Sequence, residues 1–239
     1  MRRRFFVQQF SGDTAAIEGD TAHHLGRVLR AQQGQLYELS DGHRVRLGRI
    51  EKVARDRVDF VLLEEIPAHA PAIDVTLLLS IVKFDTFEWA IEKATELGVS
   101  TIVPLAAARS EKALLAAAGK RAERWRKLLA EASQQSRRVR VPALQSVSQP
   151  TQAFNAHATA AAKILLSERP EATALRQILQ NEPAEQAVLA IGPEGGWTDA
   201  ELSAAQVHNF RQASLGKLIL RTETAVAAAL ASINYALGE

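Results

Sequence analysis

The sequence predicts an α/β protein with a smaller, β-rich domain at its N-terminus. Short strands of alternating apolar residues fill the first part of the chain, and two prolines, Pro67 and Pro71, then interrupt regular structure. From Ile73 onward, apolar strands alternate with helices, which is typical of a mainly parallel sheet covered by helices. We therefore expect two domains within the 239 residues, one over 1–70 and one over 71–239.

The first domain is predicted to be a small barrel. An Asp41-Gly42 pair between two alternating runs is a hairpin signal, and one short helix is expected over His23–Arg30. Several short strands with a single helix are typical of a small barrel. The predicted strands are Phe5–Val7, Leu36–Leu39, Val45–Val53 and Val58–Ile66.

A continuous apolar strand, of the type that is buried on both faces, opens the second domain. Stretches with helical spacing of apolar residues then alternate with further short apolar runs. The predicted strands are Ile73–Val82, Thr101–Leu105, Lys163–Leu166, Ala187–Ile191 and Leu218–Leu220. The predicted helices are Thr86–Leu97, Ala118–Arg138, Ala172–Leu179, Thr198–Val207 and Glu223–Leu237.

The chain contains no cysteine, which excludes disulfides, thiolate zinc sites and cysteine nucleophiles. It has no HExxH motif, and the adjacent His23 and His24 would point in different directions, so we expect no metal site. The apolar run after Arg4 is too short for a signal peptide, and Ala225–Ala231 is too short to span a bilayer. These features predict a soluble, cytoplasmic protein without a membrane partner.

Positive charge is unevenly distributed along the sequence. The net charge is only +2, but the sequence pI is about 9.0. Local basic clusters suit a polyanion, because each neutralised phosphate releases counterions. A solvated basic helix face is an equally open interpretation. The clustered residues are Arg2, Arg3 and Arg4, and then Lys120, Arg121, Arg124, Arg126, Lys127, Arg137, Arg138 and Arg140.

The strongest functional feature is a glycine-rich loop, Gly192–Gly196, between a predicted strand and a predicted helix. Thr198 and Glu201 form a capping-box pattern that marks the start of the helix. Ligands of open α/β sheets bind at the carboxyl ends of strands, and glycines let the backbone approach a ligand closely. The loop is therefore a candidate ligand site, and a tight strand-to-helix turn is the alternative.

The carboxylate in this loop indicates what kind of ligand it suits. The loop lacks the lysine of a P-loop and the GxGxxG spacing of a dinucleotide fold, and Glu194 would repel a phosphate. A carboxylate suits a ligand that is cationic or that offers hydroxyl and amine donors. S-adenosylmethionine has a sulfonium, an amine, ribose hydroxyls and no phosphate. Pro193 and Glu194 between the glycines also disfavour a plain turn.

Two further segments combine a helix end with arginines. In Leu215–Ala225, Thr222 is a predicted N-cap and Glu223 lies in the first helical turn, where the helix dipole favours it. Arg221 at this junction would contact nucleic acid or developing charge, or would form only a surface salt bridge. In Glu131–Arg138, the two final arginines would bind phosphates or only complement the helix dipole.

Together these segments resemble the 16S ribosomal RNA uridine-N3 methyltransferases, a branch of the SPOUT class of knotted methyltransferases. The resemblance covers nearly the whole chain, and its pieces occur in the family's order. The matching segments are Arg4-Phe5-Phe6, His24–Arg30, Lys93, Glu96–Val99, Arg109-Ser110, Glu131–Arg138, Gly192–Gly196 and Leu220–Ala225.

The resemblance implies a fold and partners that composition does not show. The first domain would be a PUA-like RNA-binding barrel, and the second a SPOUT domain with a deep trefoil knot that holds a bent S-adenosylmethionine. The family works as a homodimer on 16S ribosomal RNA of the small subunit. The apolar side of the last helix is a candidate dimer face, and ordinary core packing is the alternative. That side carries Val226, Leu230, Ile233 and Leu237.

The resemblance also implies site residues. Glu194 is the candidate base or cofactor anchor, and Arg221 the candidate for stabilising the uracil anion. The expected cofactor-binding residues are Leu166, Ser167, Glu168, Gly192, Pro193, Glu194, Gly195, Leu215, Gly216, Leu218, Leu220 and Thr224. The expected RNA-binding residues are Arg2, Arg3, Arg4, His24, Arg27, Arg30, Arg109, Arg137 and Arg138.

Three other functions are compatible with parts of the sequence. One is a SPOUT methyltransferase that acts on another RNA or on a ribose hydroxyl. The second is an RNA-binding ribosome assembly factor that keeps the fold without turnover. The third is a nucleotide-binding α/β enzyme, which Glu194 and the missing phosphate-binding lysine disfavour.

Overall fold

The computed structural model describes residues 3–68, 71–180 and 185–238. These residues form two compact units. Unit 1 contains the described residues before Pro71 together with Ser133–Val141. Unit 2 contains Pro71–Ala132 and the described residues from Pro142 onward. The chain therefore leaves unit 2 at the end of its long helix and returns to it, which the sequence did not predict.

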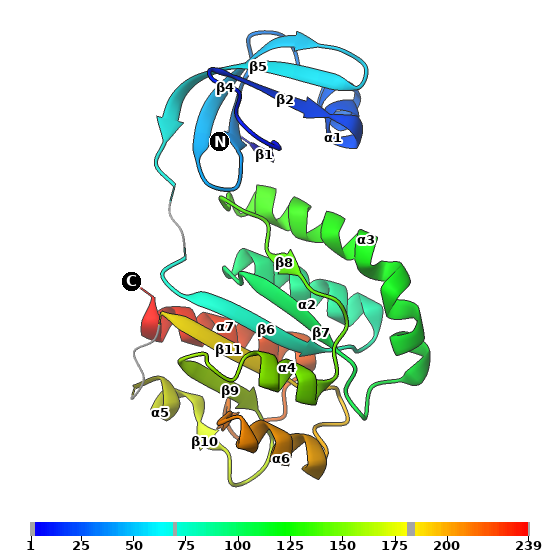
Figure 1. Ribbon diagram of the computed structural model, residues 1–239, viewed down its shortest axis with the longest axis vertical. Helices are drawn as coiled ribbons and strands as arrows, with labels where there is room; N and C mark the ends of the chain where they lie inside the picture. Colours follow the sequence, from blue (N-terminus) through cyan, green and yellow to red (C-terminus); the bar gives the residue numbers. More distant parts are fainter. Residues whose placement is uncertain (1–2, 69–70, 181–184, 239) are drawn as a thin grey trace. The chain divides into compact units, whose positions relative to one another are not determined.

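Unit 1 is built on a five-stranded sheet with the strand order β1-β3-β4-β5-β2 (Figure 1). β1 runs parallel to β3, and the other neighbouring strands are antiparallel. Among the described residues the edge strands β1 and β2 do not pair with each other, so the sheet is open and the predicted small barrel is not confirmed. The strands are β1 Arg4–Phe6, β2 Thr14–Glu18, β3 Leu36–Ser40, β4 Val45–Val53 and β5 Arg57–Ile66.

The predicted short helix of unit 1 is irregular. It consists of α1 Gly19–His23, followed at once by a π-helical turn over His24–Val28. Gly26 lies inside this turn, and glycine weakens a helix interior. Leu25 is fully buried in the core of the unit, so the turn is held by packing against the sheet.

An ion-pair network joins the two separate parts of unit 1. Glu38 on β3 is 4% exposed and Arg4 on β1 is 6% exposed. Arg4 donates to Glu38 Oε2 from Nε at 3.1 Å and from Nη2 at 2.9 Å, and its Nη1 donates to the Arg137 carbonyl. Arg137 also pairs with the other oxygen of Glu38. Ser40 adds a hydrogen bond from its hydroxyl to the carbonyl of Val139.

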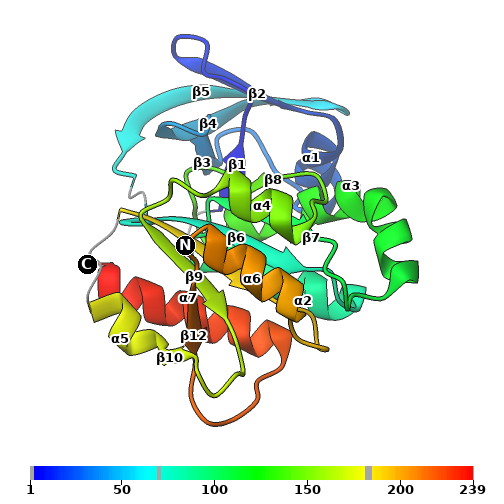
Figure 2. The same ribbon diagram turned by 60° about the horizontal axis from the view of Figure 1, so that its bottom comes forward.

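Unit 2 contains a seven-stranded, fully parallel sheet with the order β10-β12-β9-β11-β6-β7-β8 (Figures 1 and 2). In the sheet, β11 lies between β6 and β9. In the sequence, β11 follows both of these strands, and β7 and β8 separate β6 from β9. The strands are β6 Asp74–Ser80, β7 Thr101–Leu105, β8 Ala143–Leu144, β9 Ala162–Leu166, β10 Thr173–Ala174, β11 Gln186–Ile191 and β12 Arg211–Ser214.

Helices cover both faces of this sheet. α2 and α7 pack against each other on one face, and α4 and α6 pack against each other on the other (Figures 1 and 2). The helices are α2 Phe84–Glu96, α3 Lys112–Gln135, α4 Pro150–Ala156, α5 Leu175–Gln180, α6 Asp199–Val207 and α7 Thr222–Leu237. The predicted α/β class with a mainly parallel sheet is therefore confirmed for this unit.

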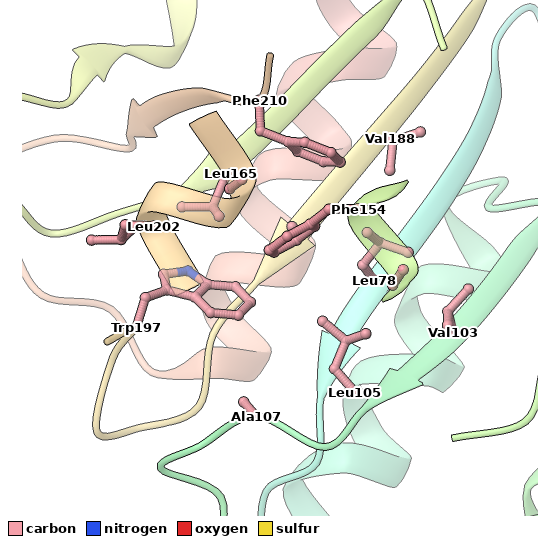
Figure 3. Close-up of a cluster of buried hydrophobic side chains, with 13 residues drawn as sticks. Leu78, Val103, Leu105, Ala107, Phe154, Leu165, Val188, Trp197, Leu202 and Phe210 are labelled. Atoms are coloured by element: carbon pink, nitrogen blue, oxygen red, sulfur yellow. The ribbon is translucent and has the colours of Figure 1, made fainter. Parts of the chain in front are cut away.

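The core beneath α4 and α6 is aromatic (Figure 3). Phe154 of α4 lies with its ring centroid 6.0 Å from that of Trp197 and 4.8 Å from that of Phe210. Leu78 of β6 and Val188 of β11 belong to the same cluster. Trp197 belongs to the loop after β11, so the core extends directly under that loop.

Two expectations about the C-terminal part are wrong. Leu218–Leu220 is not a strand, and Leu218 and Ile219 are 81% and 78% exposed. The strand beside β9 is instead Arg211–Ser214, which pairs with β9 on one side and with β10 on the other. Thr222 is not the N-cap of α7, because Arg221 occupies that position without a side-chain capping bond.

The apolar side of α7 packs inside the subunit. Val226, Leu230 and Ile233 are each 0% exposed, and α7 packs against α2. These three side chains therefore belong to the core, which was the alternative to a dimer face. Tyr235 on the same helix is 93% exposed.

Removing the carboxylate of the unit 1 network is expected to destabilise the protein strongly. Glu38→Ala leaves the buried Arg4 guanidinium without its counter-ion, which costs about 3–5 kcal/mol. Urea denaturation measures this loss of unfolding free energy. The control is Asp13→Ala, which removes an exposed ion pair to Arg46 and should cost about 0–1 kcal/mol. Equal losses in the two variants would contradict a structural role for the network.

Candidate functional site

The carboxyl ends of β9, β11 and β12 surround one cavity in unit 2. Its volume is about 900 Å³, which is in the range of small-molecule sites. The loops after these three strands supply most of its walls, and Lys83 and Thr86 at the start of α2 complete it. Because all strands of the sheet are parallel, their carboxyl ends lie at one edge, where such folds bind ligands.

The loop after β11 requires its glycines. A Cβ on Gly192 would lie 3.0 Å from the ring of Trp197, closer than such contacts normally come. Gly196 has φ +70°, a conformation that glycine adopts without strain. Pro193 is buried and Glu194 is exposed to the cavity side of the loop. The loop is therefore a tight turn whose backbone lines the cavity.

Trp197 fixes this loop to the neighbouring one. Its Nε1–H donates to the carbonyl of Leu166 at 3.0 Å, and its side chain is 6% exposed. Leu166 is the last residue of β9, so the hydrogen bond joins the loops after β9 and β11. The indole also packs on Phe154.

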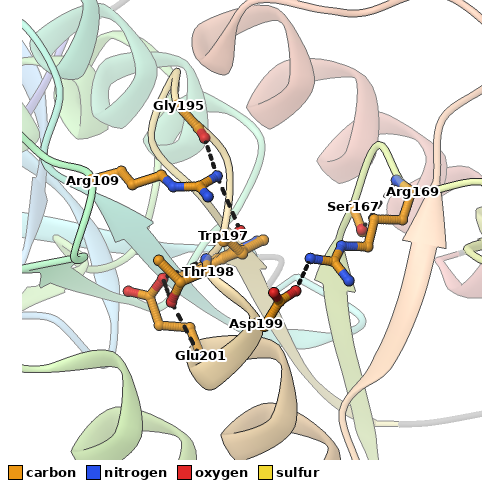
Figure 4. Close-up of polar contacts among 8 residues, drawn as sticks. All are labelled: Arg109, Ser167, Arg169, Gly195, Trp197, Thr198, Asp199 and Glu201. Carbon is orange, nitrogen blue, oxygen red and sulfur yellow. Dashed lines mark hydrogen bonds and ion pairs between the residues drawn. The ribbon is translucent and has the colours of Figure 1, made fainter.

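The predicted capping box at the start of α6 is confirmed (Figure 4). The Thr198 hydroxyl accepts a hydrogen bond from the backbone N–H of Glu201 at 3.3 Å. The Glu201 carboxylate accepts from the backbone N–H of Thr198 at 2.8 Å. This exchange fixes the point at which the loop ends and the helix begins.

Arg109 lies against the glycine loop (Figure 4). Its Nη1 donates to the carbonyls of Gly195 at 2.7 Å and Trp197 at 3.3 Å. Arg109 was predicted to bind RNA. In the structure it is exposed, and its Nη1 bonds support the loop.

A second arginine pairs with the start of α6. Arg169, in the loop after β9, forms an ion pair with Asp199 (Figure 4). The hydrogen bond from Arg169 holds the pKa of the Asp199 carboxyl below its ordinary value, and its charge adds to the effect. Both side chains are substantially exposed, so the pair contributes little to stability.

The structure brings the predicted cofactor residues together around the cavity, with one exception. Thr224 is not part of the cavity lining. Glu194 and Arg221, the two candidate catalytic residues, both line it and are both exposed. The predicted residues that line the cavity are Leu166, Ser167, Glu168, Gly192, Pro193, Glu194, Gly195, Leu215, Gly216, Leu218 and Leu220.

Several cavity residues were not predicted. Most of them lie just after the end of a strand or in the first turn of a helix. Because parallel strands end at one edge of the sheet, the predicted strand ends could have indicated these residues. Lys83 and Thr86 follow β6, which the sequence had correctly identified as a central strand. These residues include Lys83, Thr86, Arg169, Pro170, Trp197 and Ile219.

The predicted RNA-binding residues fall into three groups. Arg2 lies outside the described residues. Arg4 and Arg137 both pair with Glu38; Arg4 is buried, whereas the Arg137 side chain is 41% exposed. The remaining ones in unit 1 are exposed, except Arg138, which is half-buried. Burial lowers the pKa of Arg138 to about 10, with Arg140 adding to the effect, so it stays charged at neutral pH. The exposed residues are Arg3, His24, Arg27 and Arg30.

The fold and the cavity together define an α/β protein with a candidate small-ligand site at a glycine-rich loop. Within the described residues there is no cluster of three metal-ligating side chains. No helix in the described ranges is both long enough and apolar enough to cross a bilayer. The glycine loop and the similarity of this chain to known proteins indicate the class of ligand.

Comparison with known proteins gives a consistent result. A family described as "RNA methyltransferase domain" matches residues 69–234, and one described as "RNA methyltransferase PUA domain" matches residues 17–63. The chain is 34% identical to ribosomal RNA small subunit methyltransferase E of Bacillus subtilis (strain 168), over 98% of this chain and 96% of that protein. It is 35% identical to the protein of that name from Synechocystis sp., over 96% of this chain and 76% of that one.

Solved structures show the same relationship. The ribosomal RNA small subunit methyltransferase E of Neisseria gonorrhoeae, bound to S-adenosyl methionine, superimposes with a TM-score of 0.90 at 29% identity, covering 98% of each chain. A putative methyltransferase of Legionella pneumophila with the same cofactor gives 0.88 at 27% identity, over 99% of this chain and 98% of that one. The chain belongs to the RNA methyltransferase family, and within it to the ribosomal RNA small subunit methyltransferase E group.

A methyl group added to the glycine loop is expected to disrupt it. Gly192→Ala places a Cβ against the indole of Trp197 and should cost about 1–3 kcal/mol of unfolding free energy. The control is Gly119→Ala in α3, where a Cβ meets nothing within 4 Å. That variant should stabilise the protein by roughly 1 kcal/mol, because alanine is the better helix former. Equal changes in thermal unfolding would contradict the close packing of Trp197 on the loop.

Proposed function

We propose that this protein transfers a methyl group from S-adenosylmethionine to N3 of a specific uridine in 16S ribosomal RNA. The observation that carries the proposal is the glycine loop with Glu194, which lines the cavity at the carboxyl ends of β9, β11 and β12. The hydrogen bond from Trp197 to Leu166 holds this loop in place. Membership of the RNA methyltransferase family supports the reaction class. The N3 position rests on the resemblance of the loop and of Leu220–Ala225 to the uridine-N3 branch.

The cofactor is proposed to lie in the cavity of about 900 Å³, against the backbone of Gly192–Gly196. The loop after β9, from Leu166, and the loop after β12, from Leu215, would enclose it from the sides. Backbone N–H and C=O groups of these loops suit a ligand with amine, hydroxyl and base edges. The carboxylate of Glu194 suits its positive charge.

When bound, S-adenosylmethionine supplies an already activated methyl group. The protein must align uridine N3 with that methyl group and help N3 to lose its proton. Positioning alone supplies roughly 7–11 kcal/mol in favourable cases, and a general base adds about 10²–10⁴-fold. Glu194, which lines the cavity, is the proposed acceptor of the N3 proton or the proposed anchor of the cofactor. Arg221, which also lines it, is proposed to stabilise the negative charge that develops on the uracil ring.

The fold is proposed to have two finer features of the SPOUT class. The segment from β11 to α7 would form a deep trefoil knot, which is consistent with the insertion of β11 between β6 and β9. Unit 1 would act as a PUA-like RNA-binding domain, which the family match over 17–63 supports, with its open five-stranded sheet as the observed part of the proposed barrel.

Ribosomal RNA within the small subunit is the proposed partner, and the cytoplasm the proposed location. Four exposed basic residues of unit 1 are available for its phosphates, and Arg138 is the proposed contact from the segment after α3. Arg2 remains proposed by its sequence position alone. The four are Arg3, His24, Arg27 and Arg30.

The protein is also proposed to act as a homodimer. Large apolar side chains of unit 2 remain exposed, among them Tyr235 at 93%, Leu218 at 81% and Trp89 at 44%. Leu218 lines the cavity, so a second copy that covers it would also shield the site from water. A monomeric mass in analytical ultracentrifugation at micromolar concentration would contradict this arrangement.

Replacement of either candidate catalytic residue is expected to lower turnover. Arg221→Ala should reduce kcat about 10²–10³-fold, as for removal of a donor at a developing anion. Glu194→Gln should reduce it about 10²-fold if the carboxylate is the base. Methylation of small subunits under saturating cofactor measures both.

Two exposed residues outside the cavity provide matched controls, in the variants Arg176→Ala and Glu171→Gln. Wild-type kcat and RNA affinity in both active-site variants would remove these roles.

Loss of basic residues from unit 1 is expected to weaken RNA binding through phosphate contacts. Arg27→Ala and Arg30→Ala should each reduce the slope of log K against log salt by about 1, because RNA binding releases fewer counterions when one phosphate contact is lost. Filter binding to 16S RNA over a series of salt concentrations gives the slope. The affinity for S-adenosylmethionine should stay unchanged. An unaltered slope in both variants would place the RNA elsewhere on the protein.

A further inference from the structure

Glu201 is a buried carboxylate next to the cavity that does not line it. It is 6% exposed and all of its hydrogen bonds are to uncharged donors. Oε2 accepts from the backbone N–H and the hydroxyl of Thr198, both at 2.8 Å. Oε1 accepts from the backbone N–H of Ala108 at 2.8 Å. Both oxygens are therefore occupied by the protein itself.

Helix capping explains only half of this arrangement. The capping box uses the bonds between Glu201 and Thr198, and these satisfy the N-terminus of α6. Ala108 is 93 residues away in the sequence and lies in the loop after β7. The bond from Ala108 therefore joins α6 to a second loop, which a helix cap does not require.

The loop after β7 is the one that supports the glycine loop. Arg109, next to Ala108, donates to the carbonyl of Gly195 at 2.7 Å. A Cβ on Gly195 would lie 3.3 Å from the Cβ of Arg109, so the arginine stem packs closely on the glycine. Ser110 anchors the other side of the same loop through a hydrogen bond from its hydroxyl to the Ile81 carbonyl at 2.7 Å.

We propose that Glu201 and Arg109 form a clasp that holds the glycine loop in its cofactor-binding conformation, with Glu201 as a positioning residue. Glu201 fixes Ala108, and this sets the backbone from which Arg109 reaches the carbonyl of Gly195. A loop that is ordered before binding loses less conformational entropy when the ligand arrives, so the clasp raises affinity. The inference rests on the proposed placement of S-adenosylmethionine at this loop.

The competing explanation is that Glu201 only stabilises the fold. In that case, its replacement would lower the melting temperature without changing the cofactor affinity beyond what general destabilisation causes. Two measurements therefore separate the two explanations: the cofactor affinity of a Glu201 variant, and whether its effect on affinity adds to that of an Arg109 variant.

The test is calorimetric titration of the full chain with S-adenosylmethionine. In Glu201→Gln one carboxylate oxygen becomes an amide nitrogen that cannot accept a hydrogen bond, so the Ala108 or the Thr198 backbone N–H loses its acceptor while the shape is kept. Arg109→Met removes the donors and keeps the stem on Gly195. Each variant should raise Kd about tenfold, as for the loss of one hydrogen bond to a charged partner. The double variant should be at most about twofold weaker than either single one, because both act through one contact chain.

Glu88 of α2 provides the matched control. It is also 6% exposed, is held by Arg121 and Arg124, and is not part of the cavity lining. Glu88→Gln should lower the melting temperature and leave Kd for S-adenosylmethionine unchanged. A wild-type Kd in Glu201→Gln, with a melting temperature lowered as in the control, would overturn the clasp. Additive effects of Glu201→Gln and Arg109→Met would overturn it as well.

The clasp and the proposed function fail in different ways. A wild-type protein that binds S-adenosylmethionine but leaves N3 of uridine unmodified would contradict the proposed substrate alone. The clasp is measured by cofactor affinity, so weaker binding by the two variants would still support it in that case.

Discussion

The hydrogen bond from Trp197 Nε1 to the Leu166 carbonyl is the interaction on which the site depends. β9 and β11 are neighbours in the parallel sheet, but their loops leave the sheet independently, and nothing in the strand pairing fixes one loop against the other. The indole does so because it is both a buried member of the core and a donor at the loop. Gly192 follows from the same constraint, since a side chain there would displace the ring. The glycine loop is thus a continuation of the hydrophobic core as well as a ligand surface.

The arginines of the protein divide into structural and exposed groups, and the division assigns them different tasks. Arg4 is buried and held by a buried carboxylate, so its guanidinium is not free for phosphate, whereas Arg109 is exposed and donates to the Gly195 carbonyl through Nη1. Arg27 and Arg30 lie exposed on unit 1, and Arg221 lies exposed in the cavity of unit 2. A buried, fully bonded arginine rigidifies its surroundings, whereas an exposed one keeps its charge available to a polyanion. The proposed RNA contacts of unit 1 therefore come from the second group.

Much of the fold followed from local pattern, and the errors came from long-range contacts. The strand Val45–Val53 and the capping box at Thr198 were predicted as they occur, because alternation and capping are local signals. Leu218–Leu220 has the composition of a strand, but Arg211–Ser214 is the segment that pairs with β9 and β10, and composition does not show which segment joins the sheet. The structural use of Arg4 depends on residues more than thirty positions away, as the separation of 34 to Glu38 shows. The cavity-lining loops were predictable because parallel strands bring their ends together.

The account assigns one reaction to one cavity, with a loop held ready by Trp197 and a carboxylate and an arginine facing the reacting base. Its central claim is the transfer of a methyl group to N3 of a uridine in 16S ribosomal RNA. The most direct measurement is incubation of small ribosomal subunits from a strain that lacks this activity with the purified protein and S-adenosylmethionine, followed by mass spectrometry of the digested RNA. The account predicts N3-methyluridine at a single position of the 16S RNA. Methylation of a different atom or base, or bound cofactor without any transfer, would contradict it.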